Sequence, residues 1–237
     1  MTDLGDLFDE YALRARVYPS LLASLPIPVT VLLVWPDPGL RALWPVAVGV
    51  GVMFFLANYT RSRGQRLERA LVAKWNGLPT THMLRYSEID NSVMFRRRRE
   101  RLEKVFGEAL PTAEEESADP TGADASYIAA TRSLIARVRA DTKRFSRVHE
   151  ENIHYGFRRN LLALKTIGVT VLAALTLGDV VLAAIRFRTA TVTALAIDLV
   201  LALAWLRVVN PDWVWQAGRT YAERLFETLE QGDVPPV

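Results

Sequence analysis

The chain has 237 residues, of which 50% are hydrophobic and 23% are charged, with a net charge of +3 and no cysteine. The missing cysteines exclude disulfides, zinc–thiolate sites, iron–sulfur clusters and cysteine nucleophiles. An apolar fraction this high excludes a disordered or collagen-like chain.

The apolar residues are gathered into four long blocks. They run from Tyr18 to Trp35, from Leu40 to Asn58, from Leu161 to Ile185 and from Ala190 to Val209. A helix needs roughly 20 apolar residues to cross the hydrocarbon core of a bilayer, so each block predicts a membrane span. The first block is the weakest, because it is short and carries two prolines that should bend the helix. The alternative is a soluble helical bundle, but the second block has none of the regular polar positions that such helices carry.

Short links set the topology of the predicted spans. Pro36 to Gly39 joins the first two blocks and Arg186 to Thr189 joins the last two, so each pair can form only an antiparallel hairpin. Both termini and the middle segment must then lie on one side of the membrane. Of the 29 basic residues, 20 lie between Tyr59 and Asn160, which places that side in the cytoplasm.

The sequence therefore predicts an all-α integral membrane protein, with two transmembrane helical hairpins flanking a helical cytoplasmic region. The predicted parts are an amphipathic N-terminal segment (1–17), a first hairpin (18–58), a basic helical cytoplasmic domain (59–160), a second hairpin (161–209) and an amphipathic C-terminal tail (210–237). The expected location is a membrane, with the termini and central domain cytoplasmic.

Turn and capping signals divide the predicted cytoplasmic domain. Apolar spacing predicts a short helix from Ser62 to Trp75, which ends at the turn signal Asn76-Gly77-Leu78-Pro79. Asp90 or Asn91 can cap a second helix that runs to Phe106 and stops at Gly107. Residues 111–124 read as an acidic, turn-rich linker.

A heptad spacing follows the linker. The residues that repeat at intervals of four and three are Tyr127, Thr131, Leu134, Val138, Asp141, Phe145 and Val148. Extended through Asn152, Tyr155 and Arg159, this stripe predicts a helical stalk leading into the third span. It can serve as an oligomer seam or pack against other cytoplasmic helices of the same chain.

Both ends of the chain carry amphipathic stripes. After the N-cap signal Asn210-Pro211, apolar residues recur from Val214 to Leu229 at helical spacing. Leu4, Leu7, Phe8 and Tyr11 do the same at the N-terminus. Either stripe can lie on the inner leaflet or pack on the central helices.

Arginines form the strongest charge feature. Four consecutive arginines, Arg96 to Arg99, spread over most of a helix circumference, so they cannot all face one flat partner. They can be a solvated face balanced by nearby glutamates, or they can contact anionic lipid or an anionic ligand. The candidate ligand site consists of Arg96, Arg97, Arg98, Arg99, Arg158 and Arg159.

Two acids lie inside the predicted spans. Asp179 and Asp198 are each about nine residues, or roughly 13 Å, from the tip of the second hairpin. Each costs about 2.5–3.5 kcal/mol to insert in lipid, so both should face inward, share a proton or find polar partners such as Thr191 or Thr193. They can line a pore, join subunits or form a structural pair.

Catalytic and metal-binding motifs are not found. His149 and His154 are five residues apart, which places them on different faces of a helix, whereas a zinc site of the HExxH kind needs a spacing of four. No phosphate loop or nucleophile elbow occurs. The chain is therefore predicted to be neither an enzyme nor a metalloprotein, and no cofactor is expected.

The layout resembles the SMODS-associating four-transmembrane effectors of bacterial anti-phage (CBASS-like) defence, which are encoded beside cyclic-oligonucleotide synthases. Three stretches carry the resemblance. They are Leu13-Arg14-Ala15-Arg16-Val17-Tyr18 with Leu25-Pro26-Ile27-Pro28-Val29, then Ala73-Lys74-Trp75-Asn76-Gly77-Leu78-Pro79, and Glu151 to Asn160 (ENIHYGFRRN). The resemblance implies a cytoplasmic part that senses a signal such as a cyclic nucleotide, and spans that then assemble to breach the inner membrane.

The expected function is thus a membrane-disrupting or pore-forming effector that forms a homo-oligomer in the bilayer when triggered from the cytoplasm. A cyclic nucleotide is the expected ligand and no nucleic acid is expected as a partner. Two alternatives stay open: a constitutive small transporter or channel subunit, and a membrane-anchored scaffold that recruits a cytoplasmic partner through the seam.

Overall fold

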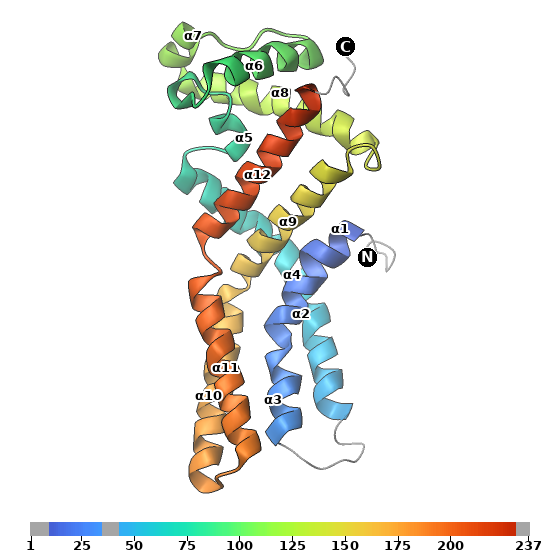
Figure 1. The fold of residues 1–237 in the computed structure, drawn as a ribbon, viewed down its shortest axis with the longest axis vertical. Helices are drawn as coiled ribbons and strands as arrows, with labels where there is room; N and C mark the ends of the chain where they lie inside the picture. Colours follow the sequence, from blue (N-terminus) through green and yellow to red (C-terminus); the bar gives the residue numbers. More distant parts are fainter. Residues whose placement is uncertain (1–9, 35–42, 231–237) are drawn as a thin grey trace. The chain divides into compact units, whose positions relative to one another are not determined.

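The computed structural model describes residues 10–34 and 43–230, and these residues form helices and turns without any strand (Figure 1). In chain order the elements are α1 (Glu10–Ala12), η2 (Leu13–Val17), α2 (Tyr18–Ser24), α3 (Pro26–Val34), α4 (Leu43–Trp75), α5 (Pro79–His82), η4 (Tyr86–Glu88), α6 (Ser92–Phe106), α7 (Ala113–Ala118), α8 (Pro120–Ala140), α9 (Ser146–Ala163), α10 (Lys165–Ile185), α11 (Thr189–Arg207) and α12 (Pro211–Glu230). The predicted all-α class is confirmed for these residues.

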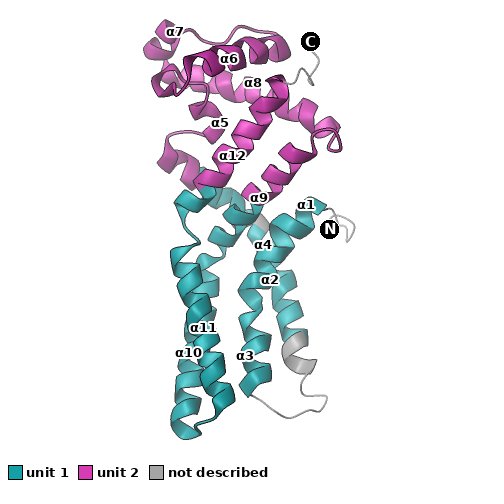
Figure 2. Ribbon diagram, viewed as in Figure 1, with its two compact units in different colours: residues 1–69, 156–214 teal, residues 70–155, 215–237 magenta. Residues whose placement is uncertain are grey.

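Internal contacts divide the chain into two compact units (Figure 2). Unit 1 comprises Met1–Arg69 and Gly156–Val214, and unit 2 comprises Ala70–Tyr155 and Trp215–Val237. Unit 2 therefore combines most of the segment predicted as the cytoplasmic domain with the C-terminal tail.

Three helices of unit 1 are long and apolar enough to cross a membrane: Glu10–Val34, Lys165–Ile185 and Thr189–Arg207. The first of them joins α1, η2, α2 and α3, so it begins earlier than the predicted block. The second predicted span falls partly outside the described residues, and its described part belongs to α4, where the apolar stretch Ala47–Thr60 is shorter. Length and composition thus support three spans, and a fourth stays a prediction.

The prolines of the first span interrupt its helix without ending it. α2 stops at Ser24 and α3 begins at Pro26, because a proline at that position cannot donate the next backbone hydrogen bond. The amide of Leu25 still donates to the carbonyl of Leu21 at 2.8 Å, and Val29 donates to Leu25 at 3.3 Å. The helix therefore continues across residue 25 with fewer hydrogen bonds.

In unit 1, α10 and α11 pack along one another and α3 packs against both. Gly168 allows this close approach, since a Cβ there would lie 3.0 Å from the ring of Trp205. The buried core of the unit consists of Ala23, Leu56, Leu161, Leu164, Leu172, Trp205 and Val209.

In unit 2, α8 packs against α5, α6 and α7, and α12 contributes to the same core. The large buried side chains of that core include Leu84, Leu102, Tyr127, Leu134, Phe145, Leu225, Phe226 and Leu229. The C-terminal stripe is thus buried in protein. Of the two alternatives for this stripe, the structure shows packing on the central helices.

Several local signals are confirmed. Asn91 caps α6 by accepting hydrogen bonds from the amides of Val93 and Met94, and Gly107 ends that helix with φ 88°. Asn210 likewise accepts a hydrogen bond from the amide of Trp213. The predicted helix 62–75, however, is the end of the longer helix α4, which stops where Asn76 takes φ 57°.

The prediction of an acidic linker over residues 111–124 is wrong. This segment contains α7 and the start of α8, and a capping box at Thr112 and Glu115 begins α7. Asp119 then caps α8 by accepting from the amide of Gly122. The acidic and small residues that suggested a linker act here as helix caps.

The predicted continuous stalk is also wrong. α8 ends at Ala140 and α9 begins at Ser146, and Asp141 turns the chain between them by accepting a hydrogen bond from the amide of Arg144 at 3.0 Å. An aspartate that binds a backbone amide three residues ahead competes with the helix. A second interruption at Leu164 separates α9 from α10.

Candidate functional site

The two intramembrane acids are both buried in unit 1. Asp198 on α11 is 0% exposed and Asp179 on α10 is 2% exposed. Their inward orientation, expected from the cost of a carboxyl group in lipid, is confirmed. They lie on α10 and α11, which pack along one another, and they are called here the polar centre of unit 1.

A threonine of the first span completes this centre. The hydroxyl of Thr30 on α3 donates to Asp198, with distances of 3.0 Å to Oδ2 and 3.2 Å to Oδ1. The expected polar partners were Thr191 and Thr193, but Thr193 is exposed and donates to the carbonyl of Thr189 in its own helix. The hydrogen bond therefore joins the first span to the last one.

Asp179 is less completely satisfied than Asp198. Its Oδ2 atom is buried and has no hydrogen-bond partner among the described residues. A buried oxygen of this kind is costly unless the group serves a purpose. Asp179 is therefore the side chain of unit 1 most suited to hold a proton or cation, or to meet a polar group in another conformation.

Beside its apolar core, unit 1 buries polar side chains and exposes large apolar ones. The buried polar side chains include Ser20, Ser24, Thr30, Thr60, Asn160, Asp179, Thr191 and Asp198. Large apolar side chains are exposed on the same helices, among them Phe55, Leu177, Ile185, Val200 and Leu203. An exposed apolar surface on long apolar helices fits a lipid environment.

The six arginines of the candidate ligand site are divided between the two units. Arg158 and Arg159 belong to unit 1, where Arg159 forms a 2.7 Å ion pair with Glu68. Arg158 donates to the carbonyl of Trp213 and its guanidinium lies 4.9 Å from the centroid of that indole ring. Both side chains thus have structural contacts inside unit 1.

The four consecutive arginines of α6 take four different environments. Arg96 and Arg97 are exposed, and Arg96 is only 3.8 Å from Glu100 in a loose ion pair. Arg98 is half-buried and donates to the carbonyl of Met83 at 2.9 Å. Burial lowers the pKa of Arg98, while the carboxylates of Glu230 and Glu223 oppose that shift.

Arg99 is a structural residue of the unit 2 core. It is 5% exposed and donates to the carbonyls of Leu84 and Pro111 and to the hydroxyl of Tyr127. Its guanidinium also lies 4.5 Å from the ring centroid of Tyr86. Burial and these three hydrogen bonds hold Arg99 in the core, away from a ligand at the surface of α6.

Tyr127 links Arg99 to a buried carboxylate. Its hydroxyl donates to Oε2 of Glu116 at 2.6 Å, and Glu116 also accepts from the amide of Tyr86 at 3.0 Å. Burial and the hydrogen bond to Glu116 raise the pKa of Tyr127 to about 12. This network ties α6, α7 and α8 together.

The raised pKa predicts a loss of stability at high pH. The stabilisation is complete below pH 10, the ordinary tyrosine pKa, and disappears as the pH rises through about 12, because the unfolded chain loses this proton first. Between these values wild type should lose up to about 3 kcal/mol more than Tyr127→Phe. Thermal unfolding of both proteins from pH 8 to 12 measures the difference, and parallel curves would contradict the assignment.

Sequence reasoning missed Arg85. It donates from Nε and Nη2 to both carboxylate oxygens of Asp124, at 2.9 and 2.6 Å, and pairs with Glu88 at 3.2 Å. The hydrogen bond with Asp124 raises the pKa of Arg85. A single arginine in a turn gives no sequence signal of such a long-range pair.

The predicted oligomer seam is mostly buried within unit 2. Tyr127 and Leu134 are fully buried, Val138 and Phe145 are buried beside them, and Asp141 alone is exposed in the turn after α8. In this conformation the seam packs on helices of its own chain, so it presents no surface to a second copy.

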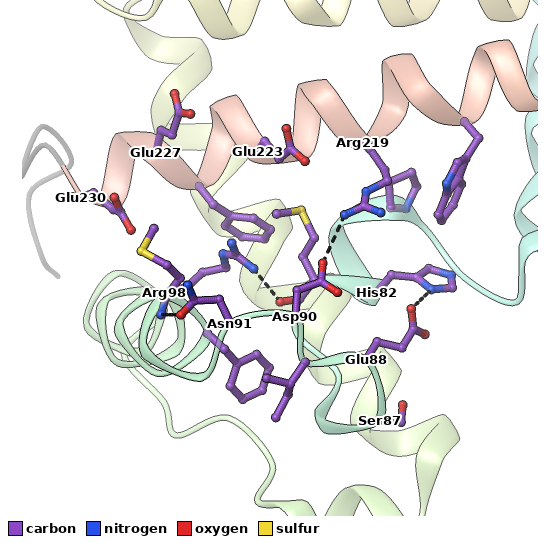
Figure 3. A pocket seen from close by; sticks show the side chains of 17 residues that line it. His82, Ser87, Glu88, Asp90, Asn91, Arg98, Arg219, Glu223, Glu227 and Glu230 are labelled. Carbon is purple, nitrogen blue, oxygen red and sulfur yellow. Dashed lines mark hydrogen bonds and ion pairs between the residues drawn. The ribbon is translucent and has the colours of Figure 1, made fainter.

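A cleft of about 660 Å³ lies in the described part of unit 2 (Figure 3). α12 forms one side, and α5, residues 87–91 and α6 form the other. Of the predicted ligand-site arginines only Arg98 lines it, beside Arg219 and His82. His82 Nδ1 lies 2.6 Å from Glu88, and Arg219 lies 3.4 Å from Asp90.

Groups of three or more metal-binding side chains do not occur among the described residues. Comparisons with models of protein families, with curated proteins and with solved structures gave no match.

Proposed function

We propose that this protein is a membrane-permeabilising effector, in which unit 1 crosses a bacterial inner membrane with four spans and unit 2 receives a cytoplasmic signal. The resemblance to the four-transmembrane defence effectors suggests this role, and the basic residues between Tyr59 and Asn160 support the orientation. The proposal contains no catalytic step.

The polar centre formed by Thr30, Asp179 and Asp198 is the observation that carries the proposal. In the described conformation all three side chains are buried and Thr30 donates to Asp198, while large apolar side chains of the same helices are exposed. Separation of α3 from α11 would break the hydrogen bond of Thr30 and uncover two carboxyl groups. Spans with one newly polar face can lower their free energy by assembling around water.

Unit 1 also has an exposed surface through which several copies of the chain could assemble. Ala174 and Gly178, one turn apart on α10, are exposed, and a Cβ at Gly178 would meet no atom within 4 Å. Small residues at this spacing let the backbones of two membrane helices approach closely. Among the described residues both positions are exposed and nothing fills the space beside Gly178, which supports contact between copies.

The cyclic nucleotide implied by the resemblance would have to bind the exposed guanidinium groups of Arg96 and Arg97. Arg99 is committed to the core of unit 2, and Arg158 and Arg159 are engaged in unit 1. As part of this proposal, the trigger shifts the equilibrium only if it binds the open state better than the closed one.

Replacement of Thr30 by valine tests the closed state. Valine keeps the shape of threonine but leaves Asp198 without this donor, so opening should become easier. Interhelical hydrogen bonds in membranes contribute about 0.6 to 1.7 kcal/mol, so dye release from liposomes without any trigger should increase about three- to fifteenfold. Thr193→Val on the lipid-facing side of α11 is the matched control and should release dye like wild type. Equal release from all three proteins would contradict the proposal.

A constitutive proton or cation channel is the second candidate, because Asp179 has a buried oxygen without a hydrogen-bond partner among the described residues. It predicts ion flux through the wild-type protein with no trigger and no effect of cyclic nucleotides. The third possibility, a scaffold that recruits a partner through the heptad seam, lacks a surface because those residues are buried.

A further inference from the structure

The cleft of unit 2 has the size of a site for a small molecule. Its volume of about 660 Å³ falls within the range of about 300 to 1,000 Å³ that is common for such sites. The two sides come from distant parts of the sequence, α12 on one side and residues 79–98 on the other (Figure 3). The folded unit is thus required to form it.

Apolar side chains cover much of the lining. They include two methionines and three aromatic residues, Met83, Met94, Phe95, Trp215 and Phe226. Methionine adapts to the shape of a ligand, and an aromatic face attracts a cation. The guanidinium of Arg98 already shows this preference, because it lies 5.2 Å from the ring centroid of Phe226.

The charged lining has an excess of carboxylates. The acidic residues are Glu88, Asp90, Glu223, Glu227 and Glu230, and the basic ones are Arg98 and Arg219. Both guanidinium groups have partners inside the unit, the carbonyl of Met83 for Arg98 and the carboxylate of Asp90 for Arg219. Five carboxylates and two engaged arginines make the cleft unfavourable for a polyanion.

Three of the five carboxylates of the cleft lie together on α12. Glu223, Glu227 and Glu230 are four and three residues apart, a spacing that places them on one face of the helix. Glu227 is paired with Arg224 at 2.7 Å. Glu223 and Glu230 make no hydrogen bond or ion pair with a described residue and act on Arg98 only at longer range.

We propose that this cleft binds a small organic cation with an apolar body, such as a primary amine attached to an aromatic ring. The ammonium group would meet the carboxylates of Glu223 and Glu230, and the ring would pack on Phe226 and the methionines. The binding site does not rest on the proposed function; only a further role of its ligand in controlling permeabilisation would.

Calorimetric titration of the detergent-solubilised full-length protein tests the ligand class, with titrations into empty micelles subtracted. The probes share one skeleton and differ in charge: phenethylamine is a cation, 2-phenylethanol is neutral and phenylacetate is an anion. We expect phenethylamine to bind at least about tenfold more tightly than the other two, and its affinity to fall as salt is added. Equal affinity for all three probes, or tighter binding of phenylacetate, would overturn the proposal.

The variant Glu223→Gln/Glu230→Gln locates the site. It keeps the side-chain shapes, breaks no ion pair and should weaken phenethylamine binding about tenfold, while the affinity for 2-phenylethanol stays unchanged. Glu108→Gln/Glu114→Gln removes the same charge from exposed positions outside the cleft and should bind like wild type. Both variants must melt at the wild-type temperature for this comparison. If both then lose the same affinity for phenethylamine, net charge explains the effect and the proposed site is overturned.

Dye release measured with the same probes separates this proposal from the proposed function. If phenethylamine binds selectively but does not change dye release, the cation site is supported and its ligand is not the trigger of permeabilisation. A cyclic dinucleotide that releases dye and competes with phenethylamine would overturn the assignment to a cation. The same nucleotide releasing dye without competition would leave the cation site intact and place the trigger elsewhere.

Discussion

Arg99→Leu is expected to destabilise unit 2 by on the order of 4 kcal/mol, because it leaves the buried carbonyl of Leu84, the partly buried carbonyl of Pro111 and the hydroxyl of Tyr127 without their donor. Each unsatisfied buried group costs about 1 to 3 kcal/mol. This is a large part of the stability of a typical domain, about 5 to 15 kcal/mol. Leucine fills part of the volume but cannot donate.

Thermal unfolding of the full-length protein in detergent measures this loss. For a unit of this size, a change on the order of 4 kcal/mol lowers the melting temperature by at least about 15 °C. Arg97→Leu is the matched control, since it makes the same change two residues earlier at an exposed position of α6, and it should stay within about 0.5 kcal/mol of wild type. Similar melting of the two variants would show that Arg99 does not hold the core together.

The same pair of variants separates structure from ligand binding. If the arginine run is a ligand site, Arg97→Leu should weaken nucleotide binding and leave folding unchanged. Arg99→Leu should act through folding alone. Four adjacent residues of one type thus have different roles, because consecutive positions on a helix point in different directions.

The sequence was most informative where the signal is local. The Asn91 cap, the Gly107 stop and the Asn210 cap each depend on a few neighbouring residues, and all three lie where the pattern predicted them. The inward orientation of Asp179 and Asp198 could also be predicted, because lipid penalises a carboxyl group wherever else it points.

Contacts between distant segments could not be predicted in this way. Thr30 and Asp198 are 168 residues apart, and nothing in the sequence distinguishes Thr30 from Thr191 or Thr193 as the donor. The pair of Arg85 and Asp124 is hidden in the same way. The packing of whole helices decides which polar groups meet. The periodicity of residues within one helix does not identify those partners.

The heptad stripe shows a related limit. Its spacing correctly identified residues that are buried together, including Tyr127, Leu134 and Val138. A stripe predicts that a helix face is covered but does not identify the helix that covers it. Here the covering helices belong to the same chain.

The double variant Asp179→Leu/Asp198→Leu is expected to abolish permeabilisation and to raise the melting temperature. Each aspartate costs about 2.5–3.5 kcal/mol in a membrane helix, whereas leucine is favourable there. The closed form should therefore become more stable, and the opened form should lose the polar groups that face water. Dye influx into expressing cells, measured in the Thr30→Val background that opens without a trigger, should fall to the level of cells lacking the protein.

The companion variant Asp179→Asn/Asp198→Asn separates polarity from charge. Its amide oxygens can still accept hydrogen bonds, but its side chains can neither ionise nor carry a proton. Dye influx that survives the asparagine pair and disappears with the leucine pair would assign these residues to a polar lining, as an assembling effector requires. Loss of influx in both variants would favour the proton or cation channel, because that mechanism needs the carboxyl groups themselves. Influx that survives both would show that α10 and α11 do not line the path, and the permeation pathway would then have to be formed by other helices of unit 1.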